Sequence, residues 1–95
     1  MAFDDLPLHD AVLSSIHISW EAVRCDICIY LVGGASHVLV FEGFSNLEFP
    51  KKEPWGPSSI INAGRESTSG NFEIELQSGD VLRISAEVWR FGVSQ

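Results

Sequence analysis

The sequence predicts an all-β domain built mainly from antiparallel strands. Apolar and polar residues alternate with a period of two along five short stretches, which is the pattern of strands with one buried face. Glycine-containing turns separate several of these stretches, as hairpins require. The 95 residues are enough for one hydrophobic core. We therefore expect residues 1–95 to form a single domain of five to six strands, arranged as a curved sheet, a small sandwich or a partly closed barrel.

Two alternating stretches near the N-terminus predict the first hairpin. The stretch from Val12 to Trp20 places large apolar side chains on one face, and the stretch from Cys25 to Val32 does the same. The residues between them let both apolar faces point the same way in an antiparallel pair. The expected inner faces are Val12, Ile16, Ile18 and Trp20 in the first strand, and Cys25, Ile27, Ile29 and Leu31 in the second.

A turn and a third strand follow this hairpin. Gly33 and Gly34 predict the turn, because adjacent glycines tolerate the positive φ angles of hairpin loops. The next strand begins near His37, and residues 38–41 are apolar on both faces, which favours a central position in a sheet. Gly43 predicts a bulge or a kink before the chain continues through residues 44–49.

The C-terminal half contains the hairpin with the clearest register. Apolar residues at 72, 74 and 76 alternate with polar ones, and the alternation resumes at 82. Matching the apolar faces requires an odd number of loop residues, which a loop of residues 77–79 provides if Gly79 is left-handed. The expected cross-strand pairs are Ile74 with Leu82, Phe72 with Ile84, and Glu73 with Arg83.

Residues 50–70 are rich in Pro, Gly, Ser and charge. Three prolines within residues 50–57 exclude a regular helix or a central strand there. We expect a short strand around Ile60 and Ile61, or one short helical turn near residues 58–64. Trp55 lies between prolines, so it is either a core plug that covers an open end of the sheet or a rigid anchor for a partner.

Charge restricts the classes of partner. Thirteen Asp and Glu against six Lys and Arg give a net charge of −7, which repels nucleic acids and anionic lipids and attracts basic proteins. No apolar stretch approaches the roughly 18 residues of a membrane-spanning helix. The acidic start at residues 1–5 is unlike a secretory signal, and two cysteines are too few for a disulfide framework. We therefore expect a cytoplasmic protein that binds neither nucleic acid nor membrane.

Two short motifs suggest chemistry, but each has a simpler interpretation. Cys25 and Cys28 form a C-x-x-C pattern within a strand, which sends the sulfurs to opposite faces and leaves zinc without enough ligands. Leu8-His9-Asp10 contains a base next to a carboxylate, yet adjacent side chains rarely face each other, and no nucleophile motif accompanies them. We expect no enzymatic activity, no metal and no cofactor, and a turn-forming role for His9 and Asp10.

Three short segments carry a resemblance to a known group. They are Leu8-His9-Asp10-Ala11 before a strand that ends in Trp20-Glu21, then Pro54-Trp55-Gly56-Pro57-Ser58, and finally Leu76-Gln77-Ser78-Gly79-Asp80. Together they resemble small bacterial proteins grouped with the immunity proteins of polymorphic-toxin systems. The resemblance implies a cytoplasmic protein that neutralises a cognate toxin by tight binding, and it assigns no functional residue.

We therefore expect a protein-binding module, with immunity-type inhibition of a basic toxin as the most specific hypothesis. If Val88 points inward, Trp89 lies on the outer face, whereas a bulge would turn Trp89 inward. One alternative is a small-molecule or carbohydrate-binding module with Trp55 and His9 in a pocket. Another is a structural homo-oligomer that pairs exposed strand edges or buries Trp89. The candidate contact residues are Trp55, Trp89, Glu73, Glu75, Arg83, Glu87 and, for the pocket alternative, His9.

Overall fold

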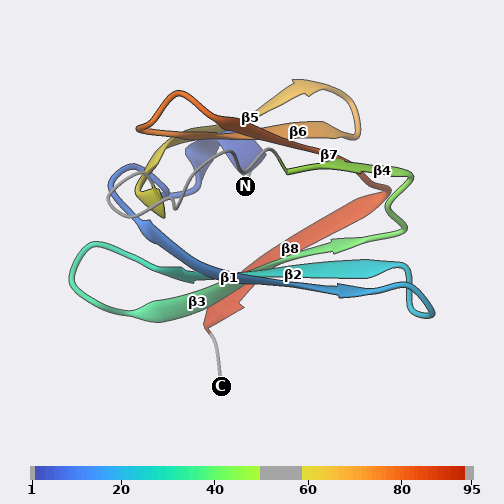
Figure 1. The fold of residues 1–95 in the computed structure, drawn as a ribbon, viewed down its shortest axis with the longest axis horizontal. Helices are drawn as coiled ribbons and strands as arrows, with labels where there is room; N and C mark the ends of the chain where they lie inside the picture. The colour runs from blue at the N-terminus through green and yellow to red at the C-terminus, as the bar shows by residue number, and fades with distance from the viewer. Residues whose placement is uncertain (1, 50–58, 94–95) are drawn as a thin grey trace.

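The computed structural model describes residues 2–49 and 59–93, in which eight strands form two four-stranded antiparallel sheets (Figure 1). The sheets lie face to face with the hydrophobic core between them, so the predicted all-β, antiparallel class is confirmed and the arrangement is the sandwich alternative. The described strands outnumber the five to six that we expected. Sheet A contains, in spatial order, β1 (Val12–Ser19), β2 (Arg24–Tyr30), β3 (Ser36–Glu42) and β8 (Val88–Val93). Sheet B contains β4 (Asn46–Glu48), β7 (Val81–Ser85), β6 (Asn71–Leu76) and β5 (Ile61–Thr68).

The first three strands form consecutive hairpins, as predicted. Cys25, Ile27 and Ile29 of β2 are fully buried on the inner face. Gly33 and Gly34 have φ angles of 101° and 92°, which explains why glycines occupy this turn. β3 lies between β2 and β8, so its apolar residues on both faces do correspond to a position inside the sheet.

The inner face predicted for β1 is wrong at both ends. A bulge between Leu13 and Ser15 shifts the alternation, so Leu13 is buried whereas Val12 is 39% exposed opposite Tyr30. Trp20 lies beyond the last residue of β1, in the turn, and is 74% exposed. Periodicity alone does not reveal an added residue, because the sequence remains apolar on either side of the bulge.

The predicted register of the C-terminal hairpin is confirmed. The Leu76 N–H donates to the Asp80 carbonyl oxygen at 2.8 Å, and Gly79 has a φ angle of 97° in the three-residue loop. The left-handed glycine makes the odd loop length possible, and the odd length keeps both apolar faces on the core side. The observed pairs are Phe72 with Ile84, Glu73 with Arg83, and Ile74 with Leu82.

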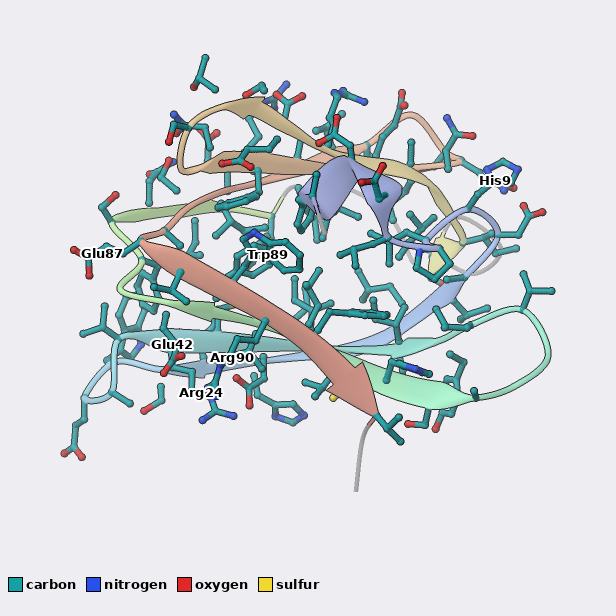
Figure 2. All side chains as sticks on the ribbon, turned by 180° about the vertical axis from the view of Figure 1, so that it is seen from behind. His9, Arg24, Glu42, Glu87, Trp89 and Arg90 are labelled. Carbon is teal, nitrogen blue, oxygen red and sulfur yellow. The ribbon has the colours of Figure 1, made fainter. Side chains whose placement is uncertain are left out.

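The chain crosses between the sheets twice at one end of the sandwich. It leaves β3 at Gly43, where φ is 68°, and it returns from β7 to β8 through residues 86–87. The second crossing reverses the alternation, so Val88 is 50% exposed while Trp89 points between the sheets (Figure 2). The expectation that Val88 points inward is therefore wrong, and of the two alternatives for Trp89 the structure shows the inward one.

β5 is longer than the short element that we expected. Residues 61–64 begin this strand, so the helical turn expected near residues 58–64 does not extend into them, although Ser59 has a 3-10 conformation. The 3-10 helix η1 spans Phe3–Asp5, and no helix in the described part of the chain is long and apolar enough to cross a membrane. Trp55 and its neighbouring prolines lie outside the described residues.

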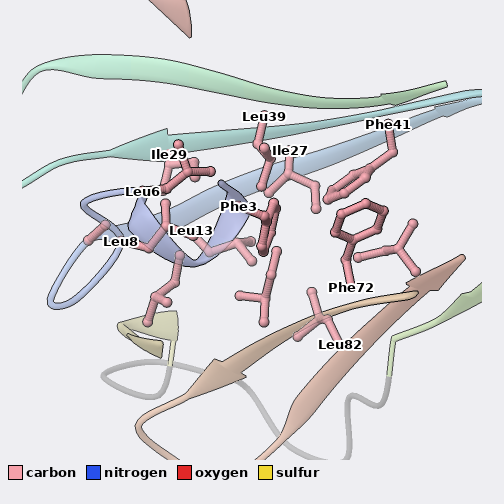
Figure 3. Close-up of a cluster of buried hydrophobic side chains, with 14 of the residues drawn as sticks. Phe3, Leu6, Leu8, Leu13, Ile27, Ile29, Leu39, Phe41, Phe72 and Leu82 are labelled. Atoms are coloured by element: carbon pink, nitrogen blue, oxygen red, sulfur yellow. The ribbon is translucent and has the colours of Figure 1, made fainter. Parts of the chain in front are cut away.

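The N-terminal segment fills the core between the sheets (Figure 3). Phe3 is 1% exposed, and its ring lies 4.9 Å from that of Phe72, 5.4 Å from that of Trp89 and 6.0 Å from that of Phe41. Leu6 and Leu8 are buried in the same cluster. The sequence pattern did not predict this plug, because residues 3–8 have no clear strand or helix period.

The same segment covers the outer edge of β5. The Asp4 carboxylate accepts a hydrogen bond from the Glu66 N–H at 2.8 Å. The Asp10 N–H donates to the Ile61 carbonyl at 2.8 Å, and the Ile61 N–H donates to the Ala11 carbonyl at 2.7 Å. These bonds satisfy backbone groups that would otherwise face solvent at a sheet edge.

Candidate functional site

Three of the predicted contact residues lie together on the outer face of sheet B. Glu73 binds Arg65 at 2.7 Å and Arg83 at 3.3 Å, while Glu75 lies 3.6 Å from Arg65. Each of these charged groups therefore already has a partner on a neighbouring strand. Partly exposed pairs of this kind contribute roughly 0 to 1 kcal/mol each, and a partner would have to compete with them. This face is consequently a weak candidate for recognition.

The other predicted contact residues do not form one site. Figure 2 shows Glu87 at the end with the two crossings and His9 toward the opposite end. Trp89 packs edge-on against Phe3 inside the sandwich, so it is half-buried core rather than an exposed contact. Trp55 lies outside the described residues, so its place relative to His9 is not described.

His9 and Asp10 form the turn that precedes β1, as expected. The His9 Nδ1 atom lies 2.7 Å from the Asn62 carbonyl oxygen, and its Nε2 atom lies 3.6 Å from the Asp10 carboxylate. The two side chains therefore do face each other, contrary to expectation. Asp10 has a φ angle of 65° and also accepts a hydrogen bond from the Gln77 side chain at 2.7 Å. These bonds connect the turn to sheet B.

The two cysteines point to opposite faces of sheet A. Cys25 is buried, and this burial, together with the nearby Asp26 charge, raises the pKa of its thiol to about 11. Cys28 is half-buried on the outer face, and both thiols are free. Among residues 2–49 and 59–93, no group of three or more His, Cys, Asp and Glu side chains is placed to hold a metal ion.

The described residues form shallow depressions on the outer faces. One, of about 260 Å³, is surrounded by polar residues of sheet B such as Asn46, Asn71 and Ser85. Another, of about 250 Å³, lies on sheet A beside Val38 and Gly92, and a smaller one of about 130 Å³ lies on the same sheet beside His17. Pockets for small ligands usually span about 300 to 1,000 Å³ and enclose the ligand. None of these three depressions therefore favours the small-molecule alternative.

The strongest candidate for recognition is an exposed aromatic cluster that we name the Trp20 surface. The Trp20 ring packs edge-on against Phe44 at 5.5 Å, and Phe44 in turn packs on the core. The Gly43 N–H donates to the Val23 carbonyl at 2.8 Å, which joins the β1–β2 turn to the first crossing. The Glu87 side chain occupies the space beside Gly43 that a Cβ atom would need. The Trp20 surface consists of Trp20, Glu21, Val23, Phe44 and Glu87.

The charges on the described surface are unevenly compensated. Each of the four arginines in the described part makes an ion pair: Arg24 with Asp26, Arg65 and Arg83 with Glu73, and Arg90 with Glu42. The Asp26 hydrogen bonds and charge also raise the pKa of Arg24 above its ordinary value. In contrast, the carboxylates of Glu21, Glu48 and Glu87 make no hydrogen bond or ion pair within this part of the chain. Two of these three carboxylates belong to the Trp20 surface.

Comparisons with protein-family models, with curated protein sequences and with solved structures give no significant match. None of them tests the resemblance to immunity proteins, which stays a prediction. The residues of the chain itself therefore carry the functional argument.

Proposed function

We propose that the protein is a binding module for a basic protein and that it acts as an immunity-type inhibitor of a cognate bacterial toxin. The observation that supports this most directly is the Trp20 surface, which contains a tryptophan that is 74% exposed and two carboxylates, Glu21 and Glu87, that have no partner among the described residues. Large exposed apolar groups surrounded by polar residues are typical of interaction sites.

The geometry of Trp20 suits an anchor in an interface. Its ring is held by Phe44, which is itself packed on the core, so little side-chain freedom is lost on binding. Tryptophan is among the residues that contribute most to interface energy. A tryptophan face also attracts cationic groups, especially arginine.

The carboxylates define the charge of the partner. The carboxylates of Glu21 and Glu87 have no partner in residues 2–49 and 59–93, and the whole chain has a net charge of −7. Such a field accelerates association with a basic protein and weakens as salt is added. Inhibition requires only that binding covers the active site of the toxin, so the proposal includes no catalytic role. The free thiols of Cys25 and Cys28 are compatible with the cytoplasmic location that the proposal includes.

The direct test uses the product of the gene adjacent to that of this protein. Co-expression is expected to restore the growth of cells that this product inhibits, and the purified pair is expected to form a complex. Raising NaCl from about 50 to 500 mM should weaken the complex, because screening reduces the attraction between opposite charges. The absence of both rescue and complex formation would contradict the proposal.

The Trp20 surface is tested with matched variants. Trp20→Ala is expected to weaken the complex by about 30-fold, which corresponds to the roughly 2 kcal/mol of an interface hot spot. Tyr30→Ala is the control, because Tyr30 is also exposed but lies on the outer face of sheet A, opposite Val12. Glu87→Gln should slow association more than Glu48→Gln does. Equal effects of Trp20→Ala and Tyr30→Ala would exclude this surface.

A further inference from the structure

We infer that β8 is a self-pairing edge, at which two copies of the chain add antiparallel to each other about Phe91 and extend sheet A across both copies. This inference is independent of the proposed function, because it concerns another surface and another partner.

Three of the four edges are short, covered or irregular within the described part of the chain. β4 has three residues, which offer few backbone groups to another strand. β5 is covered by the N-terminal segment through Asp4 and Ile61. β1 contains a bulge between Leu13 and Ser15, and its first residue, Val12, bridges to Ile60. Such features are the usual means by which sheets avoid adding strands.

β8 has none of these features. It is six residues long and regularly paired with β3 from Val88 to Val93. In an antiparallel ladder alternate residues direct their N–H and C=O groups away from the neighbouring strand, so β8 presents such groups outward. No described segment other than β3 pairs with β8, and Val93 is 71% exposed.

The charge on β8 argues against the basic partner proposed above as the occupant of this edge. The only charged residue between Val88 and Val93 is Arg90, and its side chain is paired with Glu42 at 2.9 Å. A basic strand added here would bring a second cation toward Arg90. A second copy can reduce this repulsion by a register that places the two Arg90 residues diagonally and not directly opposite each other.

The pleat and the charges select the register. Residues that face each other across a strand pair must lie on the same side of the sheet, so only registers centred on a residue are allowed. Centring on Arg90 would place the two arginines directly opposite each other, which is unfavourable. Centring on Phe91 places the two phenylalanines opposite each other and each Arg90 opposite Gly92 of the other copy, and it brings Val93 opposite Trp89.

Gly92 provides room for the incoming arginine. A Cβ atom added at Gly92 would meet no atom within 4 Å, and Val38 lies opposite Gly92 in the ladder. The shallow depression on sheet A is lined by Val38 and Gly92 together with Arg24 and Arg90. The aliphatic part of Arg90 from the second copy can pass over Gly92 while its charged end stays in solvent, away from these two arginines.

The salt dependence separates this inference from the proposed function. Two copies that each carry a net charge of −7 repel each other, so screening by salt should strengthen the dimer. Binding to a basic protein should weaken under the same change. Dimer formation can therefore be refuted while binding to a basic protein is confirmed, and the reverse is also possible.

The first experiment is sedimentation analysis of the full chain at about 10 µM to 1 mM, in low and in high salt, a range chosen for weak interfaces of small area. The expected mass rises from one chain toward two with concentration, and it rises further at about 500 mM NaCl than at 50 mM. A mass of one chain under all conditions would overturn the inference.

The second experiment tests the register by disulfide formation in a Cys28→Ser background, which removes the half-buried thiol of the same face. Arg90→Cys and Gly92→Cys are made separately, oxidised alone and as a mixture. Directly opposite residues have Cα atoms about 4.5 to 5.5 Å apart, which a disulfide spans. Only the mixture should cross-link efficiently. Cross-linking of Arg90→Cys alone, or none in the mixture, would refute pairing about Phe91.

Discussion

Gly64 of β5 offers a sharp test of how the N-terminal segment packs. A Cβ atom at this position would lie 2.6 Å from Leu8 Cδ1 and 3.2 Å from Phe3 Cε2. Both of these side chains belong to the plug between the sheets. Gly64→Ala should therefore push the N-terminal segment out of its place, although alanine in a strand is normally the better residue.

Two opposing effects determine how much Gly64→Ala changes the free energy of unfolding. Overpacking of a core typically costs about 1 to 3 kcal/mol, whereas replacing glycine in a strand stabilises by about 0.5 to 1 kcal/mol. We expect a net loss of about 1 to 2 kcal/mol for Gly64→Ala alone. Leu8→Ala alone should cost about 2 to 5 kcal/mol, because Leu8 is buried.

The double variant distinguishes packing from a general effect of the substitution. In the Leu8→Ala background the nearest obstructing atom is gone, so Gly64→Ala should be neutral or stabilising by up to about 1 kcal/mol. Urea unfolding followed by tryptophan fluorescence measures all four proteins. Gly92→Ala is the control, because no atom lies within 4 Å of its added Cβ. An equal cost of Gly64→Ala in both backgrounds would show that Leu8 does not pack on β5.

Three further predictions concern the cysteines and the first crossing. The pKa of the Cys25 thiol in the folded protein, about 11, lies above its ordinary value of 9.0, so this thiol ionises first in the unfolded chain. The free energy of unfolding should therefore fall as the pH rises from 9 to 11, by up to about 3 kcal/mol. Denaturant titrations of the wild type and Cys25→Ala check this, and parallel pH profiles would contradict it. Iodoacetamide should label Cys28 of the native protein well before buried Cys25, which mass spectrometry of peptides can measure, and simultaneous labelling would be inconsistent with the burial. Gly43→Ala should cost about 1 to 2 kcal/mol even with Glu87→Ala, because its φ of 68° is unfavourable for L-residues whatever the space, and a neutral effect in thermal unfolding would refute this.

The sequence was sufficient to predict strand register and buried faces where neighbouring residues all indicated the same arrangement. In the C-terminal hairpin, the alternation on both sides and Gly79 in the loop permit one register, and the observed pairs of Ile74 with Leu82 and Glu73 with Arg83 match it. The inner face of β2 was equally clear, because no bulge interrupts its pairing with β3. Such elements depend on neighbours in the sequence, and a single sequence contains that information.

The sequence was insufficient to predict the packing of the N-terminal segment, because that packing depends on residues far away in the chain. Phe3 is buried because Phe72 and Trp89 lie near it in space, and nothing in residues 2–8 indicates these neighbours. The covering of β5 likewise depends on Asp4, which is 62 residues from its partner Glu66. Contacts of this kind arise only once the sheets are assembled.

Strand periodicity did not determine the positions of Trp20 and Trp89, and the physical cause is the same for both. Alternation assigns a face only while a strand continues, and both residues lie where a strand ends or begins. Trp20 follows the end of β1 and lies outside, whereas Trp89 follows a crossing that changes sheets and so lies inside. Such ends and crossings are also where backbone departs from the sheet and side chains become available to partners. For this fold, the residues that strand periodicity assigns least well therefore include those that the structure makes the best candidates for binding.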